Sequence, residues 1–170
     1  MRLVKTPEEI ALMQHAAGIS REAHQAAARL AQPGRIEYEL EAELARTFRA
    51  RGGAGPAYGS IVGGGKNATI LHYIRNDQPL VDGELLLIDA GVEYQGYASD
   101  VTRTYPIGGR FVGAARDLYS VVLDAQQAAH AASKPGATLP EIHQTTIRVL
   151  VDGLRALGIL SGSTDEIVSK

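Results

Sequence analysis

The sequence predicts an α/β protein of the α+β kind, in which an antiparallel sheet packs against helices. Two observations carry this prediction. Apolar residues recur at helical spacing in the first 51 residues and again after residue 110. Between these regions, short apolar runs bounded by glycine and proline are typical of strands. A chain of 170 residues, 45% of them hydrophobic, is long enough to bury its own core, and its size favours one domain.

Two helices are predicted before residue 52. Thr6, Pro7 and Glu9 have the order of an N-cap, a first helical residue and the partner of a capping box. Apolar residues then recur at near-helical spacing until Pro33: Ile10, Met13, Ala17, Ala23, Ala27 and Leu30. In the second helix, residues 36–51, apolar residues stand four apart and are expected to face the sheet: Ile36, Leu40, Leu44 and Phe48.

Residues 57–73 are predicted to form two short strands around a turn of three glycines. This is not a Walker phosphate loop, because Ser60 stands where that motif needs glycine and Asn67 where it needs serine or threonine. Near the end of this stretch, His72 directly follows the mostly apolar residues 68–71. Taken alone, a histidine at a strand end is more often structural than catalytic.

A hairpin carrying two aspartates is predicted next. The apolar run at residues 85–88 reads as a buried strand that ends in Asp89, and residues 96–105, which contain Asp100, have the composition of a second strand. A symmetric turn centred between residues 94 and 95 would place Asp89 directly opposite Asp100. Their Cβ atoms would then lie about 5 Å apart on one face of the sheet, which Thr102 would share.

Two facing carboxylates repel unless one takes up a proton or a cation sits between them. A hard divalent metal relieves the repulsion, and paired metals bridged by carboxylate form a known hydrolytic arrangement. The alternative is that Asp89 caps a turn and Asp100 is a solvated strand residue. The spacing of the two aspartates alone does not decide between these interpretations.

Two more helices are predicted after the hairpin. Residues 110–133 have a helical apolar period that Pro135 ends, and Thr138 with Glu141 forms a second capping box before a helix that runs to Gly158. Residues 161–170 either begin another helix or fray. Four histidines on the predicted helices are expected to be surface or packing residues rather than ligands: His15, His24, His130 and His143.

Composition excludes several classes of site and partner. The chain has no cysteine, which excludes disulfides and thiolate metal sites and leaves carboxylate and imidazole as ligands. Its 17 basic and 19 acidic residues are spread along the chain, without the basic patch of a nucleic-acid-binding protein. No apolar run has the length of a signal peptide core or a membrane span, so we expect a cytoplasmic protein with no membrane partner.

Several segments resemble the pita-bread metallopeptidases, the family of methionine aminopeptidase, prolidase and aminopeptidase P. They are KTPEEIALMQHAAGIS, SIVGGGKNATILHYIRND, ELLLIDAGVEYQGYASDVTRTYPIGGRF and LGILSG. The residues of these segments are most similar to those of the Xaa-Pro aminopeptidase branch. The resemblance implies a dinuclear-metal aminopeptidase that releases the N-terminal residue from peptides with proline at the second position. Prolidase and methionine aminopeptidase activity remain alternatives, as does a non-catalytic pita-bread module that binds a peptide or protein.

The resemblance also implies roles for individual residues. Asp89 and Asp100 match two of the family's five ligands to two divalent ions, for which manganese is the expected metal and cobalt, zinc or iron are alternatives. His72 matches a catalytic histidine that is not a ligand and hydrogen-bonds the substrate or the tetrahedral intermediate. Tyr58 matches another substrate-binding position.

The resemblance covers the N-terminal half of a pita-bread catalytic domain, residues 1–170. The preceding creatinase-like domain and the C-terminal half, with a histidine and two glutamate ligands, are expected to be absent. We therefore expect the isolated 170 residues to be inactive, and self-association or pairing with the missing half to be plausible.

Overall fold

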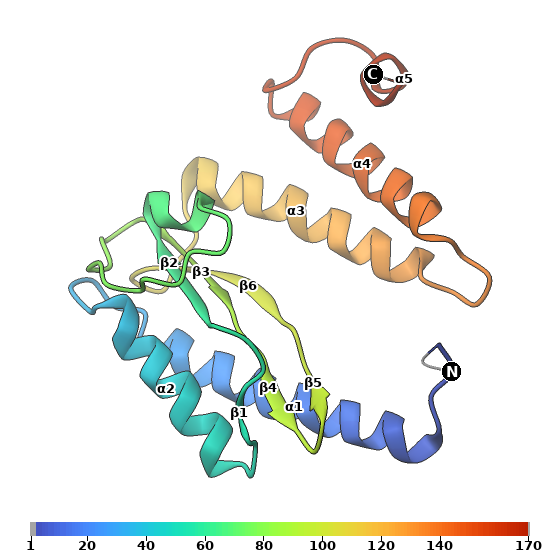
Figure 1. Ribbon diagram of the computed structural model, residues 1–170. Coiled ribbons are helices and arrows are strands. Elements are labelled where there is room, and N and C mark those ends of the chain that lie inside the picture. Colours follow the sequence, from blue (N-terminus) through green and yellow to red (C-terminus); the bar gives the residue numbers. More distant parts are fainter. Residues whose placement is uncertain (1–2, 170) are drawn as a thin grey trace. The chain divides into compact units, whose positions relative to one another are not determined.

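The computed structural model describes residues 3–169 and divides the chain into two compact units, Met1–Arg110 and Phe111–Lys170. The first unit contains two long helices, α1 (Pro7–Arg29) and α2 (Glu37–Ala50), as Figure 1 shows. The remaining elements of this unit are β1 (Gly55–Pro56), β2 (Ile61–Gly64), the 3-10 helix η1 (Gly65–Thr69), β3 (Leu85–Asp89), β4 (Val92–Tyr94), β5 (Tyr97–Ala98) and β6 (Thr102–Pro106).

The strands form two antiparallel sheets, in the orders β1-β4-β5 and β2-β3-β6. One hairpin passes through both, because β3 leads into β4 and β5 leads into β6. Between the sheets, the Ala90 N–H donates to the Val101 carbonyl at 3.1 Å and the Ser99 N–H donates to the Val92 carbonyl at 2.9 Å. The predicted antiparallel sheet is confirmed, although its second strand is broken at residues 99–101.

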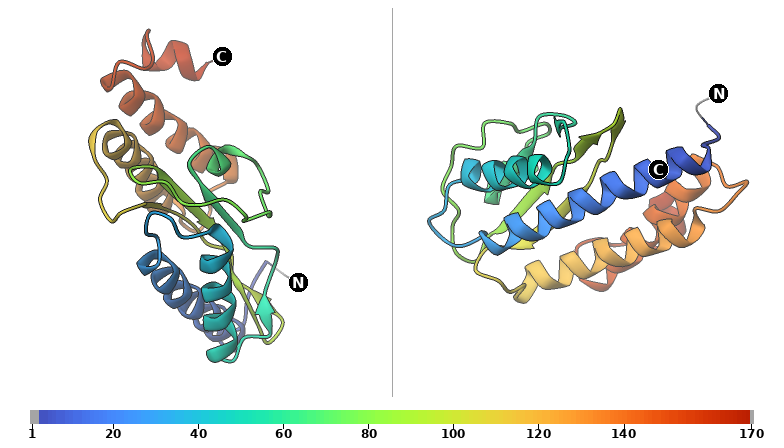
Figure 2. Two further views of the ribbon diagram at one scale, coloured as in Figure 1. Left: turned by 90° about the vertical axis from the view of Figure 1, so that its left-hand side faces the viewer. Right: turned by 90° about the horizontal axis from the view of Figure 1, so that it is seen from below.

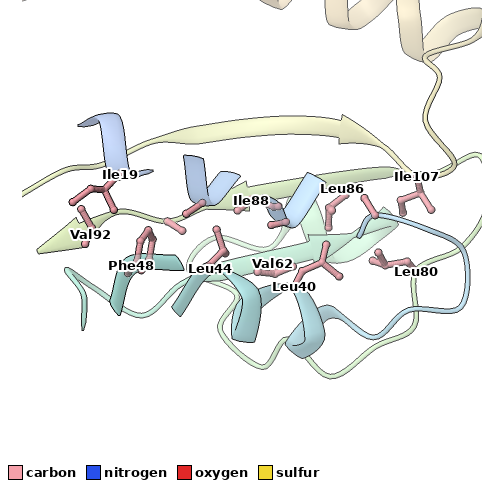
Figure 3. Packing of buried hydrophobic residues seen from close by; sticks show 14 of the residues in the cluster. Ile19, Leu40, Leu44, Phe48, Val62, Leu80, Leu86, Ile88, Val92 and Ile107 are labelled. Atoms are coloured by element: carbon pink, nitrogen blue, oxygen red, sulfur yellow. The ribbon is translucent and has the colours of Figure 1, made fainter. Parts of the chain in front are cut away.

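Helices α1 and α2 pack on the strands and bury the core between them (Figures 2 and 3). The predicted apolar face of α2 is confirmed, because Leu40, Leu44 and Phe48 are fully buried. The predicted stripe of α1 is wrong in its first half, since Ile10 and Met13 are 44% and 40% exposed. The buried residues of α1 are Ala16, Ile19, Ser20, Ala23, His24 and Ala27. Alanines occupy both faces of this helix, so the apolar period alone does not identify the packed one.

Helix boundaries follow the predicted capping signals. At the start of α1, the Thr6 N–H donates to the Glu9 carboxylate at 2.7 Å, and the Glu9 N–H donates to the Thr6 hydroxyl at 3.3 Å. The second predicted box is also present, because the Thr138 N–H donates to the Glu141 carboxylate at 2.8 Å. Such boxes supply partners for N–H groups that the first helical turn leaves unpaired.

The second unit consists of helices: α3 (Gly113–Ala132), α4 (Leu139–Ala156) and the short α5 (Thr164–Val168). Helices α3 and α4 pack against each other (Figure 1). Their contact at Gly153 is close, since a Cβ added there would lie 2.5 Å from a methyl carbon of Val121. The polar end of the chain forms a short helix at residues 164–168, and Lys170 lies outside the described residues. Among residues 3–169, no helix is long and apolar enough to cross a membrane.

Residues 65–73 differ from the prediction of a second short strand. After β2, the chain turns into η1, and residues 70–73 have no regular structure beyond turns. The side chain of Asn67, in the middle of η1, is buried and donates hydrogen bonds to Glu37 at 3.0 Å and to Tyr73 at 3.1 Å. These distant partners, which no local pattern reveals, favour the tight turn over a strand.

Candidate metal and substrate site

Asp89 and Asp100 lie on neighbouring segments of the hairpin, but they are not directly opposite each other. Asp89 ends β3 and pairs with Thr102 of β6, so the expected pairing with Asp100 is wrong by two residues. The physical reason is the turn. Tyr94 pairs with Tyr97, and both intervening residues have positive φ, 50° at Gln95 and 83° at Gly96. A two-residue turn with positive φ at both positions matches the twist of the two strands. The hairpin is therefore centred between Gln95 and Gly96, one residue further along the chain than predicted.

Tyr58 nevertheless joins the two carboxylates. Its hydroxyl oxygen lies 2.5 Å from Oδ1 of Asp89 and 3.1 Å from Oδ1 of Asp100. The tyrosine precedes β2, 31 residues before Asp89 and 42 before Asp100. Three of the residues singled out from the sequence therefore meet at one place.

The environment of Tyr58 keeps its hydroxyl protonated. Burial raises the pKa of the Tyr58 phenol well above its usual range, and the hydrogen bond to Asp89 raises it further. A phenol has a single O–H donor, so it can donate a full hydrogen bond to only one of the two carboxylates at a time. The second carboxylate is left without an equivalent partner in this cluster.

This arrangement fits a divalent metal. Two carboxylates within reach of one hydroxyl form a concentrated, oxygen-only donor set, which suits hard cations and manganese. Among residues 3–169, no group of three or more His, Cys, Asp or Glu side chains is close enough to hold a metal together. The described part of the chain thus brings together two carboxylates that could hold a metal, and no third such side chain lies close enough to join them.

A buried polar cluster fixes the backbone beside the aspartates. The hydroxyl groups of Ser20, on α1, and Ser99 lie 2.6 Å apart, and both accept from the Val92 N–H at 3.0 and 3.1 Å. Gly91 passes so close to Ser99 that an added Cβ would lie 1.7 Å from the Ser99 carbonyl oxygen. The sequence patterns do not identify Ser20 and Ser99, and only Gly91, two residues after Asp89, indicates a close approach of the backbone.

His24 supports the same segment from α1. It is 2% exposed, and its Nε2 lies 3.0 Å from the carbonyl oxygen of Ala90, the residue after Asp89. Burial lowers the pKa of His24, while the hydrogen bond to Ala90 acts in the opposite direction. Of the two roles expected for His24, surface residue or packing residue, the structure therefore supports packing.

His72 lies on an exposed turn and makes no hydrogen bond within the described residues. Its φ of 56° is in the left-handed region. A non-glycine residue held there stores strain, of order 1–3 kcal/mol, and such residues cluster at functional sites. The hydrogen bonds that join Tyr58 to the aspartates do not include His72.

Comparison with known proteins identifies close relatives. A family model described as metallopeptidase family M24 matches residues 11–164. The chain is 44% identical over 170 residues to an Escherichia coli (strain K12) protein named Xaa-Pro aminopeptidase, covering 100% of this chain and 38% of that relative. The Haemophilus influenzae protein of the same name is also 44% identical, with coverage of 100% and 40%.

Solved structures agree with the sequence comparison. The structure of Pseudomonas aeruginosa aminopeptidase PepP superimposes with a TM-score of 0.96 at 48% identity, over 99% of this chain and 38% of that one. A variant of E. coli aminopeptidase P in complex with substrate superimposes with a TM-score of 0.97 at 44% identity, again over 99% and 38%. The chain therefore spans 38% to 40% of the length of these relatives.

Proposed function

The chain belongs to metallopeptidase family M24 and has its pita-bread fold, and on this premise we propose that it is part of a metal-dependent Xaa-Pro aminopeptidase. Such an enzyme would release the N-terminal residue from peptides with proline at the second position. The observation that supports this most is the pair of carboxylates, Asp89 and Asp100, gathered around the Tyr58 hydroxyl. The names of the relatives supply the substrate class.

In this proposal Asp89 and Asp100 would hold divalent ions, with manganese the expected metal. Two bound ions would act as Lewis acids toward the peptide carbonyl and activate water. The Tyr58 hydroxyl lies within hydrogen-bond distance of both carboxylates, and Tyr58 would also contact the substrate. The exposed imidazole of His72 would hydrogen-bond the carbonyl oxygen as it gains negative charge.

We further propose that the chain forms the N-terminal half of a catalytic domain whose remaining ligands lie in other residues. Two carboxylates cannot satisfy two divalent ions, since oxygen-ligated ions of this kind take about six ligands each. The 170 residues alone are thus expected to bind metal weakly and to have no turnover. A chain that binds metal tightly and cleaves peptide alone would contradict this division.

The experiment compares metal content and peptide cleavage in the complete protein that carries this chain. Asp89→Asn and Asp100→Asn each remove a negative ligand without changing side-chain size, whereas Asp117→Asn changes an exposed aspartate of α3 and serves as the matched control. We expect both site variants to lose bound metal and turnover together, and Asp117→Asn to keep both. Retention of metal and turnover in Asp100→Asn would contradict its role as a ligand.

His72→Ala separates catalysis from metal binding. Removal of one hydrogen-bond donor to a developing oxyanion lowers turnover by about 10²- to 10³-fold in other enzymes. We expect a loss of that order with unchanged metal content. Loss of metal as well would show that His72 is a ligand.

A panel of substrates tests the specificity. The complete protein is assayed on peptides that begin Xaa-Pro, on the Xaa-Pro dipeptide and on peptides that begin Met-Ala. We expect cleavage of the first class. Cleavage confined to the dipeptide would indicate a prolidase, cleavage of Met-Ala peptides a methionine aminopeptidase, and peptide binding without cleavage a non-catalytic module.

A further inference from the structure

Glu37, the first residue of α2, is a fully buried carboxylate with four hydrogen-bond donors around it. Its Oε1 accepts from the Gly64 N–H at 2.8 Å and from the Asn67 side chain at 3.0 Å. Its Oε2 accepts from the Tyr73 hydroxyl at 2.6 Å and from the Gln78 N–H at 3.1 Å. Charge-assisted hydrogen bonds of this kind are stronger than neutral ones, so Glu37 fixes each of its partners.

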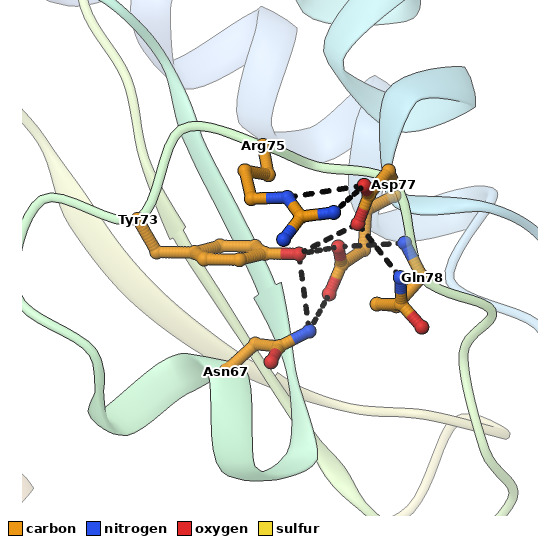
Figure 4. A network of polar contacts seen from close by, with 6 residues as sticks. Asn67, Tyr73, Arg75, Asp77 and Gln78 are labelled. Carbon is orange, nitrogen blue, oxygen red and sulfur yellow. Dashed lines mark hydrogen bonds and ion pairs between the residues drawn. The ribbon is translucent and has the colours of Figure 1, made fainter.

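These partners surround the turn that carries His72. Figure 4 shows the side chains of Asn67 and Tyr73 pointing toward the same place. Within residues 70–75, Tyr73 alone is buried, at 6% exposure, while its neighbours in this turn are exposed. Burial and the hydrogen bond to Glu37 raise the pKa of Tyr73 to about 12, so its phenol keeps the proton that it donates. Tyr73 is therefore the anchor nearest to His72, one peptide bond away.

Asn76 provides a second anchor on the other side of Tyr73. Its side chain is fully buried, accepts from the Val62 N–H at 2.9 Å and donates to the Ser60 carbonyl at 2.9 Å. It thus binds the turn to β2, as a neighbouring strand would. Asn76 has a φ of 48° and His72 a φ of 56°, and two left-handed residues so close together persist only where the surroundings determine the backbone.

We propose that Glu37 and Tyr73 are positioning residues for His72: the buried carboxylate fixes the Tyr73 hydroxyl, and this anchor holds the adjacent histidine in its left-handed, exposed conformation. The inference rests on the proposed function for the role of His72, but the ordering of the turn is independent of it. Neither residue reaches the two aspartates through a hydrogen bond in the described structure. Their effect is therefore expected on turnover and not on metal content.

A double-mutant cycle in the complete, metal-loaded protein tests this coupling. Tyr73→Phe removes the hydroxyl and keeps the ring, and His72→Ala removes the positioned group. We expect Tyr73→Phe to lower kcat by about five- to tenfold with KM and metal content unchanged, and to have less than about a twofold effect in the His72→Ala background. A merely structural role would lower kcat by the same factor in both backgrounds, and that result would overturn the proposal.

Hydrogen exchange measures the ordering without reference to activity. We expect Tyr73→Phe to raise amide exchange across residues 70–75 by about tenfold, because local opening would no longer break the hydrogen bond to Glu37. Tyr38→Phe is the matched control, since Tyr38 lies on α2 with 55% exposure. Unchanged exchange in Tyr73→Phe would overturn the proposal.

Glu37→Gln gives a second, independent variant. The amide nitrogen of the new glutamine would face donors that now point at a carboxylate oxygen, and it cannot accept from them. We therefore expect the same rise in amide exchange across residues 70–75. Glu41→Gln, also on α2, is the control for this variant. A wild-type protein that binds metal but cleaves no Xaa-Pro peptide would contradict the proposed function instead. In that case the exchange data alone would support or overturn the anchoring of the turn.

Discussion

The hydroxyl groups of Ser20 and Ser99 lie 2.6 Å apart in the interior, although 79 residues separate them in the sequence. They join the middle of α1 to the segment that precedes Asp100. Each also accepts from the Val92 N–H, so two hydroxyl groups share one backbone donor. Replacement of either serine leaves Val92 with an acceptor, whereas replacement of both leaves its N–H buried without one.

We therefore expect the two serine substitutions to be non-additive. Ser20→Ala and Ser99→Ala should each lower the free energy of unfolding by about 1 kcal/mol, the net value of a typical hydrogen bond. The double variant should exceed their sum by about 1 kcal/mol or more, because an unsatisfied buried donor has its full desolvation cost. Urea unfolding measures all three, with Ser120→Ala on the exposed face of α3 as control. Simple additivity would contradict the shared-donor interpretation.

Gly91 offers a sharper test of the same region. An added Cβ would lie 1.7 Å from the Ser99 carbonyl oxygen, which is backbone and cannot move without displacing the segment that carries Asp100. We expect Gly91→Ala to lower the free energy of unfolding by about 3 kcal/mol or more, at the upper end for overpacking. We also expect it to weaken metal binding in the complete protein.

Gly18→Ala is the matched control for Gly91→Ala. Gly18 lies inside α1, and an added Cβ would meet nothing within 4 Å. Alanine is favoured over glycine in a helix interior by about 0.5–1 kcal/mol, so this variant should be more stable than the wild type. Equal effects of the two substitutions on thermal unfolding would contradict the close contact at Gly91.

Local signals in the sequence predicted the helices well and the site only in part. Both capping boxes, at Thr6 and Thr138, are present because their partners lie three residues away. The strand that ends at Asp89 is likewise a local apolar run. The register across the hairpin was wrong by two residues, because it depends on the left-handed backbone of Gln95, and glutamine has no marked preference for that conformation.

The remaining features depend on contacts between distant residues. The sequence pattern predicts that His72 lies at a strand end, but η1 and the buried Asn67 turn the chain before it. Glu37, as a charged residue at a helix start, has the pattern of a solvated side chain, yet it is fully buried because donors come from residues 64, 67, 73 and 78. Periodicity and spacing describe single elements and cannot identify such partners.

Tyr58→Phe tests how the metal-free carboxylates are stabilised. The Tyr58 hydroxyl donates to an aspartate oxygen that a cation would also need, so the hydrogen bond and the cation compete. Without the hydroxyl, the carboxylates repel and the metal-free form loses stability, by about 1.5 kcal/mol for one hydrogen bond to a charged group. A cation then relieves more repulsion, and its affinity should rise about tenfold, which corresponds to that free energy.

Titration calorimetry with manganese measures this affinity in the complete protein, and thermal unfolding with and without the metal gives the same comparison by linkage. Tyr38→Phe controls for the loss of an exposed phenol. Weaker binding in Tyr58→Phe would show that the hydroxyl orients the ligands in the metal-bound state and does not compete with the metal.

The buried His24 predicts a dependence of stability on pH. Burial lowers the pKa of His24 in the folded protein below the ordinary value of about 6.5, at which histidine titrates in the unfolded chain. Its neutral form suits the site, because Nε2–H donates to the Ala90 carbonyl while Nδ1 faces the Tyr105 hydroxyl at 3.4 Å. Between the two pKa values the unfolded state binds more protons than the folded one. The stability contributed by neutral His24 is therefore fully present above pH 6.5 and is lost as the pH falls below that value.

Urea unfolding between pH 5 and pH 8 measures this effect. One proton taken up on unfolding lowers the free energy of unfolding by at most about 1.4 kcal/mol per pH unit. His24→Gln keeps a donor for the Ala90 carbonyl but cannot titrate, so its unfolding free energy should depend less on pH below 6.5 than that of the wild type. His130→Gln, on the exposed face of α3, should keep the wild-type dependence. If His24→Gln also kept that dependence, the acid sensitivity would come from other groups, because glutamine has no proton to gain in this range.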